Sequence, residues 1–237
     1  MPVYSIAGLN VEFKSRFGYI EGKCIDYLSE TDAPADVTVV ATDEDLRRER
    51  LSSSGAFSEE YIESVCLYRN LCLMMLSFDG MLLHSSVISV GGRCIAFLAR
   101  SGVGKTTHTV LWKELLGEAV TVINGDKPIV RFENGEPIAY GTPWGGKEMF
   151  QSNTRAVLTD LCFIERSETD SVEPMSMSCA VDRIMQQVLL PSEPQDALKT
   201  LELADRLLKA CRLWYVRCTP TLNAAKTVHK TLFGDVK

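Results

Sequence analysis

The sequence lacks the segments that would place a protein in or across a membrane. No apolar run approaches the roughly eighteen residues that a spanning helix needs. The first five residues, Met-Pro-Val-Tyr-Ser, do not begin the basic and then apolar pattern of a secretory signal. We therefore expect a cytoplasmic protein that has no membrane partner.

Clusters of metal-ligating residues are also missing. The chain has three histidines, none at metal-ligand spacing from another, and its eight cysteines include no CxxC pair. Most of the cysteines lie within apolar segments, so we interpret them as reduced residues of the core. They are Cys24, Cys66, Cys72, Cys94, Cys162, Cys179, Cys211 and Cys218.

An excess of basic residues is absent as well. The chain has 25 Lys and Arg against 31 Asp and Glu, which gives a net charge of −6. Nucleic-acid binding needs a basic face, so the balance argues against nucleic acid as a main partner. The sequence leaves open whether the protein forms a homo-oligomer, because the apolar residues of an interface have the same pattern as those of a core.

The 237 residues suffice for one main domain, and no internal repeat or low-complexity tract is visible. Residues 1–80 read as a strand-rich N-terminal portion, closed by a helix and packed on the core. A helix is predicted to begin at Ser58, whereas the charged and small residues 43–56 predict a mobile connection. The expected strands of this portion cover residues 3–6, 9–13, 24–28 and 36–41.

Residues 81–237 form the predicted core, in which strands and helices alternate, as is typical of an α/β fold. The expected strands cover residues 81–90, 93–98, 119–124, 129–133, 137–140, 158–164 and 213–218. Gly91-Gly92 and Asn134-Gly135 predict hairpin turns. Four helices are expected. The first follows residue 104 and ends at Gly117, and the second starts at Ser178 and ends at Pro191. The third starts at a Ser192/Gln195 capping box, and the fourth starts at Thr219-Pro220.

The most informative motif is Ala-Arg-Ser-Gly-Val-Gly-Lys-Thr at residues 99–106, a Walker A pattern between an apolar strand and a helix. Glycines without Cβ atoms let backbone N–H groups surround phosphate oxygens. Lys105 would reach the β and γ phosphates, and the Thr106 hydroxyl would bind Mg²⁺. We therefore predict that ATP and Mg²⁺ bind here. The predicted nucleotide contacts are Ser101, Gly102, Val103, Gly104, Lys105, Thr106 and Thr107.

A phosphate-transferring enzyme also needs a carboxylate after a neighbouring strand, to hold the metal or to deprotonate the attacking hydroxyl. Asp126 is the candidate, because it follows the apolar run 120–123. The alternative is an ordinary turn aspartate. His84, within an apolar segment, is a second candidate, and a buried core histidine is the alternative there.

Several separate motifs resemble one group of families. The His-Ser-Ser of residues 84–86, followed by a hairpin and the phosphate loop, is similar to the catalytic core of HPr kinase/phosphorylases and ATP-dependent phosphoenolpyruvate carboxykinases. With Val-Ile-Asn-Gly-Asp-Lys-Pro at 122–128 and Gly-Thr-Pro-Trp-Gly-Gly-Lys-Glu at 141–148, it most closely resembles the HPr-kinase-related family of small bacterial proteins. The resemblance extends from about Tyr61 to the C-terminus.

This resemblance implies a phosphoenolpyruvate carboxykinase/HPr kinase-like P-loop fold with a mixed sheet, preceded by the strand-rich N-terminal portion. It implies that His84, Lys105 and Asp126 are catalytic and that Thr106 and Asp126 hold Mg²⁺. It also suggests substrate contacts from the 144–148 loop, namely Trp144, Lys147 and Glu148, for which a packed aromatic turn is the alternative.

The chain departs from these families at two points. Their acidic pair is here Gly125-Asp126, so one carboxylate is missing, and the downstream Glu-Ile-Arg-Gly type of signature of HPr kinases is not apparent. HPr as the acceptor and any phosphorylase activity are therefore in doubt. The chain also lacks room for the dicarboxylate site of a carboxykinase.

Two functions follow. The first is an ATP-dependent kinase that transfers the γ-phosphate to a hydroxyl, of serine in a peptide or protein, of free serine, or of another small acceptor. The alternative is an ATP-binding regulatory or partner module with weak or no phosphotransfer.

Overall fold

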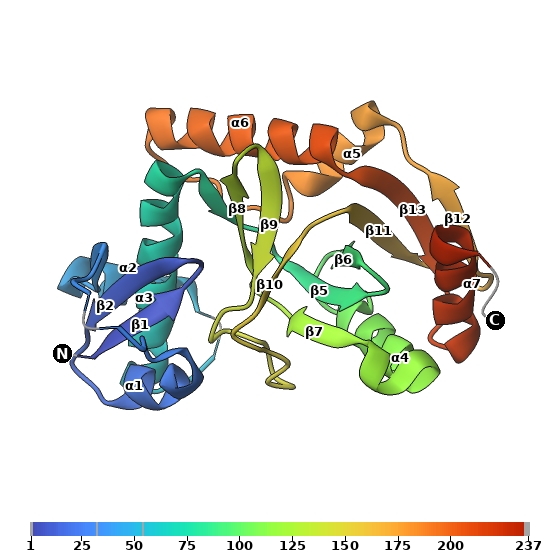
Figure 1. Cartoon of the computed structure of the whole chain (residues 1–237). Helices are drawn as coiled ribbons and strands as arrows, with labels where there is room; N and C mark the ends of the chain where they lie inside the picture. Colours follow the sequence, from blue (N-terminus) through green and yellow to red (C-terminus); the bar gives the residue numbers. More distant parts are fainter. Residues whose placement is uncertain (1, 32, 54, 235–237) are drawn as a thin grey trace.

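The computed structural model describes residues 2–31, 33–53 and 55–234, which form a mixed α/β structure (Figure 1). Outside these ranges lie Met1 of the predicted N-terminal portion, Ser54 of the predicted connection and residues 235–237 of the predicted core. Within them the chain has three sheets and seven α-helices. No helix of the described ranges has the length and the apolar composition needed to cross a membrane.

The N-terminal portion is a small sheet packed on helices. Its sheet has the order β1-β2-β3, with β1 and β2 antiparallel and β2 and β3 parallel. The elements are β1 (Val3–Ile6), β2 (Leu9–Lys14), α1 (Tyr19–Lys23), β3 (Val37–Val40), α2 (Asp43–Ser52) and α3 (Glu59–Met75). Ser58 caps α3 as predicted, because its side chain accepts a hydrogen bond from the backbone N–H of Tyr61.

Two predictions for this portion were wrong. Residues 24–28 are not a strand, since Ile25–Tyr27 form a 3-10 turn. The described part of 43–56 is largely helix α2, because Thr42 and Asp45 form a reciprocal capping box at its start. This helix is polar and buries only Leu46 among its described residues, so it carries no apolar stripe that sequence reasoning could detect.

The central sheet has six strands in the order β12-β13-β11-β6-β5-β7. They are β5 (Ser85–Val90), β6 (Arg93–Leu98), β7 (Thr121–Asn124), β11 (Asp160–Arg166), β12 (Ser171–Pro174) and β13 (Arg212–Cys218). Strands β6, β11 and β13 run parallel, and β5 is antiparallel to both β6 and β7. The carboxyl ends of β6, β7, β11 and β13 therefore share one edge with the start of β5.

Both faces of the central sheet are covered (Figure 1). Helices α4 (Lys105–Leu116) and α7 (Leu222–Phe233) pack on one face, around Phe97 and Trp112. Helices α5 (Met177–Ile184) and α6 (Pro194–Ala210) cover the other face together with a second, antiparallel sheet. That sheet has the order β10-β9-β8-β4 and consists of β4 (Gly80–Leu82), β8 (Ile129–Glu133), β9 (Glu136–Tyr140) and β10 (Arg155–Val157).

Three boundaries of the core differ from prediction. The expected strand 81–90 is divided at Leu83 and His84 into β4 and β5, which belong to different sheets. Ser176, not Ser178, caps α5, which ends at Ile184. Helix α6 follows Glu193 with Pro194 at its first turn, and no side-chain cap forms there among the described residues, so the Ser192/Gln195 box was wrong.

The last helix also begins later than expected. Thr221, not Thr219, is the residue that precedes the first turn of α7. The remaining expected strands of the core and the helix that ends at Gly117 are present, with boundaries that shift by one or two residues.

The eight cysteines all lie within the described ranges as free thiols, and six of them are buried. Burial raises the pKa of the Cys72 thiol to about 12, so this thiol stays protonated in the core.

Helix α4 buries a histidine whose protonation is coupled to folding. His108 is 1% exposed and packs edge-on to Phe97, with 4.6 Å between the ring centroids. Burial lowers its pKa from 6.5 to about 4, and only the charge of Asp170 opposes this shift. Folding therefore favours the neutral ring.

The stability that depends on this neutral ring is fully present above pH 6.5 and is lost as the pH falls toward about 4. Between these values the unfolded chain binds the additional proton. The free energy of unfolding should fall by up to about 1.4 kcal/mol per pH unit through this group alone. Urea titrations from pH 7 to 4.5 should give a flatter dependence for His108→Leu than for the wild type, and equal slopes would contradict the prediction.

Candidate functional site

The glycine-rich loop, residues 99–106, connects strand β6 to helix α4 at the shared edge of the central sheet. Gly102 and Gly104 have φ values of +79° and +133°, which side chains with a Cβ rarely adopt. No described atom lies within 4 Å of an added Cβ at either position, so the space before the loop is open. The loop leads into the first turn of α4, whose N–H groups have no intrahelical acceptors. This is the backbone arrangement that anions bind.

Lys105 is held under this loop. The residue is 7% exposed, and its Nζ donates a hydrogen bond of 2.8 Å to the carbonyl oxygen of Ala99. Burial lowers the pKa of Lys105, and the charge of Asp126 partly offsets that effect. A cation is thus positioned where the charge of a bound anion would lie.

His84 and Asp126 form a pair at the same edge. His84 Nε2 lies 3.2 Å from Asp126 Oδ1, and each side chain is 29% exposed. The strand order explains this contact, because His84 immediately precedes β5 and Asp126 follows its antiparallel neighbour β7. The backbone N–H of Ser85 also donates to the Asp126 carbonyl oxygen at 3.1 Å, which fixes the two segments together.

The carboxyl of Asp126 is kept ionised by its neighbours. Burial alone would raise its pKa, but the hydrogen bond from His84 and the charges of Lys127, His84 and Lys105 outweigh burial and lower the pKa below its usual value. A carboxylate is therefore present at neutral pH, as binding of a divalent cation requires.

Asn124, which sequence reasoning missed, shapes the turn that carries Asp126. Its side-chain oxygen accepts hydrogen bonds from the backbone N–H groups of Asp126 and Lys127 at 2.9 and 2.7 Å. Its amide nitrogen donates to the carbonyl oxygen of Thr142 at 3.0 Å, and the residue is fully buried. This is the Asx turn that asparagine favours, and it fixes the backbone of Asp126.

A cavity of about 360 Å³ brings most of the predicted residues together. We name it the phosphate cavity. The glycine-rich loop, the start of β5, the turn after β7 and the 144–148 loop each contribute to its lining. The lining residues are His84, Ser101, Gly102, Gly104, Lys105, Thr106, Thr107, Gly125, Asp126, Gly146, Lys147 and Glu148.

Trp144 is not part of this lining. The residue is 6% exposed, its Nε1 donates to Ser64 Oγ at 3.2 Å, and its ring centroid lies 4.2 Å from that of Tyr68. The tryptophan packs into the N-terminal core, which favours the alternative of a packed aromatic turn. Val103, one of the predicted nucleotide contacts, is also not part of the lining of the phosphate cavity. It lines two hollows on other sides of the loop.

The structure gives a steric reason for glycine at position 125. A Cβ atom there would lie 2.9 Å from Phe150 Cβ and 3.0 Å from the carbonyl oxygen of Gly145. The N–H of Gly125 donates to the Phe150 carbonyl oxygen at 2.6 Å, which holds this loop close. A second carboxylate therefore does not fit beside Asp126 without movement of the 145–150 loop.

Two further residues support the site. Arg166, at the end of β11, donates from its guanidinium to the carbonyl oxygens of Gly102 and Val103. Gln187, which is 4% exposed, donates to the carbonyl oxygens of His84 and Ala99 at 3.1 and 2.9 Å when its amide is oriented with the nitrogen toward them. The sequence could have indicated Arg166 as a residue of the site, because it follows the buried strand predicted at 158–164. The sequence near Gln187 contains no such indication.

Comparisons with known proteins give a limited result. No family model and no curated protein matches the sequence. Among solved structures, the Hpr(Ser) kinase/phosphatase from Coxiella burnetii matches with a TM-score of 0.31 and 11% identity, over 53% of this chain and 90% of that one. This is a distant structural relationship only.

Proposed function

We propose that the protein binds ATP with Mg²⁺ in the phosphate cavity and transfers the γ-phosphate to a hydroxyl, that of serine in a peptide or protein or of free serine. The observation that carries the proposal is the convergence of the glycine-rich loop, the buried Lys105 ammonium and the His84–Asp126 pair on one cavity. A binding loop, a fixed cation and a proton acceptor are what phosphoryl transfer requires of a protein.

The residues present fit a magnesium ion. Thr106 and Asp126 offer a hydroxyl and a carboxylate to one cavity, and Mg²⁺ prefers such oxygen ligands together with substrate phosphates and water. When bound, the ion would supply charge neutralisation for the phosphates. Asp126 suits this role because it is ionised at neutral pH.

The rest of the chemistry is assigned to side chains of this chain. The acceptor oxygen forms a bond to the γ-phosphorus while the bond from that phosphorus to the β–γ bridging oxygen breaks, and ADP leaves with the electron pair. Asp126, which accepts the hydrogen bond from His84 Nε2, or His84 itself receives the hydroxyl proton. Lys105 stabilises the charge that develops on the transferred group and on ADP.

A second candidate function is an ATP-binding regulatory or partner module without efficient transfer. The crowding at Gly125 favours it, because the turn carries a single carboxylate and has no space for another. In this case Asp126 serves the metal, and no second carboxylate is available to accept the proton.

One assay separates the two functions. The protein is incubated with Mg²⁺, γ-labelled ATP and a panel that holds HPr, free serine and peptides encoded near its gene, while calorimetry measures ATP binding. We expect label on a serine hydroxyl. Binding without transfer or hydrolysis would favour the regulatory module, and the absence of both binding and a thermal shift at millimolar ATP would contradict both functions.

A further inference from the structure

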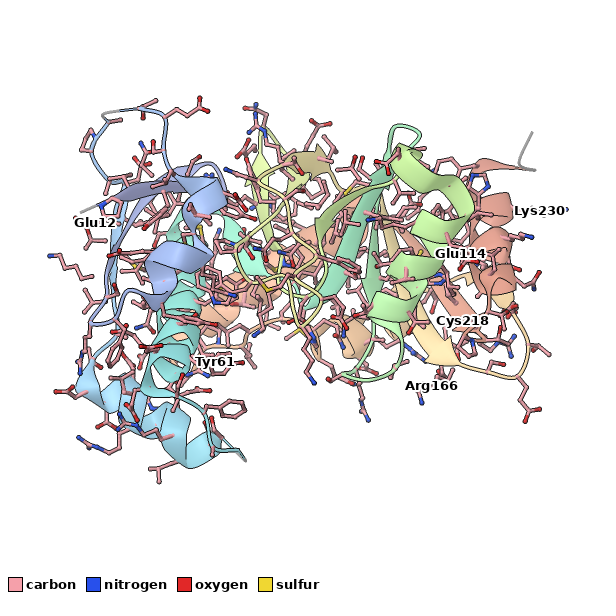
Figure 2. All side chains as sticks on the ribbon, turned by 90° about the horizontal axis from the view of Figure 1, so that it is seen from below. Glu12, Tyr61, Glu114, Arg166, Cys218 and Lys230 are labelled. Carbon is pink, nitrogen blue, oxygen red and sulfur yellow. The ribbon has the colours of Figure 1, made fainter. Side chains whose placement is uncertain are left out.

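A second hollow, of about 350 Å³, lies beside the start of helix α4. We name it the α4 hollow. It is enclosed by the glycine-rich loop, the first turns of α4 and the ends of strands β11 and β13, and Arg166 and Cys218 are labelled beside α4 in Figure 2. Its lining residues are Val103, Gly104, Thr107, His108, Leu111, Arg166, Ser167, Cys218, Thr219 and Pro220.

The α4 hollow is adjacent to the phosphate cavity. Gly104 and Thr107 line both spaces, so a molecule whose phosphates lie on the glycine-rich loop has the α4 hollow beside it. A larger hollow of about 530 Å³ lies on another side of the loop, but among the described residues it shares no lining residue with the phosphate cavity. This adjacency therefore favours the α4 hollow as the place for the rest of a nucleotide.

The composition of the lining suits a flat heterocycle. Val103, Leu111 and Pro220 supply apolar surface, while Thr107 and Thr219 supply hydroxyl groups. Small-molecule sites in proteins are concave, mostly apolar spaces of about 300–1,000 Å³ with a few polar groups that fix orientation. The size of the α4 hollow lies within this range.

His108 provides an independent indication of a ligand. It lines the hollow, yet neither ring nitrogen has a hydrogen-bond partner among the described residues. An unsatisfied buried polar group costs about 1–3 kcal/mol, and such groups are rare in native structures. A ring nitrogen of an imidazole can meet a polar ligand as a donor or as an acceptor.

We propose that the α4 hollow is the base subsite of the nucleotide, and that it takes the adenine and ribose of ATP with His108 as a polar contact of the base. This inference rests on the proposed function, since it requires the phosphates to lie on the glycine-rich loop. The edge of adenine presents an amino donor and ring-nitrogen acceptors, and either kind of group can pair with one ring nitrogen of His108.

The test compares two probes, Mg·ATP and Mg·tripolyphosphate, by calorimetry. Cys218→Trp places a large side chain in the α4 hollow, and Cys179→Trp is the matched control, since Cys179 is exposed on α5 and lines none of the three spaces described above. In Cys218→Trp we expect ATP affinity to fall tenfold or more and tripolyphosphate affinity to change less than twofold. Cys179→Trp should bind both probes as the wild type does.

His108→Phe keeps the ring in place and removes no hydrogen bond to the described protein, so it tests the polar contact in a folded chain. We expect it to reduce the preference for ATP over ITP, which differ in the exocyclic group of the base, while tripolyphosphate affinity stays constant. An unchanged preference would overturn the role of His108.

The remaining outcomes separate this inference from the proposed function. If the wild type binds ATP no more tightly than tripolyphosphate, or if Cys218→Trp weakens both probes equally, the base subsite is overturned and the phosphate site stands. If the wild type binds neither probe, the proposed function and the base subsite both fail.

Discussion

Replacing Lys105 by alanine should lower the turnover of γ-labelled ATP about a hundredfold or more. The expectation follows from the loss of one preorganised charge-stabilising donor in a site shielded from water, which typically costs 10²–10³ in rate. Lys105 meets this description, because its ammonium is buried under the glycine-rich loop and held by the Ala99 carbonyl oxygen. Label transfer or ATP hydrolysis at saturating Mg·ATP measures the effect.

Lys113→Ala is the control for this prediction. Lys113 lies in the same helix, but it is exposed, its ammonium lies over the Phe150 ring at 5.6 Å, and it does not line the phosphate cavity. Its removal should leave turnover within about twofold. Near-normal turnover in Lys105→Ala, or an equal loss in both variants, would contradict the assigned role. Thermal unfolding of each variant shows whether a loss of activity reflects a loss of folding.

The sequence predicts best what depends on neighbouring residues. The glycine-rich loop, the strand before it and the helix after it are recognisable because each is determined by residues that are close together in the sequence: the glycines, the lysine and a run of apolar residues. Hairpin turns at Gly91-Gly92 and Asn134-Gly135 are predicted for the same reason, and both form. Helix α2 was missed because its stability comes from a cap and from packing on α3, not from an apolar stripe.

The site required information that is not local. His84 and Asp126 are 42 positions apart, and only the antiparallel pairing of β5 with β7 brings their side chains to 3.2 Å. The sequence names both residues as candidates but gives no reason for their contact. Gln187 shows the same limit more strongly, since it reaches His84 and Ala99 from a region that sequence reasoning assigned only to a helix.

Trp144 shows that residues of one local motif can lie in different surroundings. It lies in a glycine-rich segment beside Lys147 and Glu148, which do line the phosphate cavity. Its own side chain turns away and packs with Phe13 and Tyr68 of the N-terminal portion. The 144–148 loop thus has one residue that attaches it to the N-terminal core and two that face the phosphate cavity.

Gly125→Asp, which places a second acidic residue beside Asp126, should destabilise the protein and should not raise turnover. Overpacking a close-packed site costs about 1–3 kcal/mol. The added Cβ would lie within 3.0 Å of Phe150 Cβ and of the Gly145 carbonyl oxygen. The new carboxylate would also face carbonyl oxygens of the same loop, which adds repulsion. Urea unfolding and ATP turnover measure the two parts of the prediction.

Gly22→Asp is the matched control, because no described atom lies within 4 Å of an added Cβ at this exposed position of α1. Surface substitutions of this kind change stability by about 0.5 kcal/mol or less. If Gly125→Asp is as stable as Gly22→Asp and raises turnover, the turn has space for two carboxylates and the second one assists the transfer. If Gly125→Asp is destabilised and wild-type turnover is measurable, the chemistry uses a single carboxylate, and His84 is the group at hand to share the proton with Asp126.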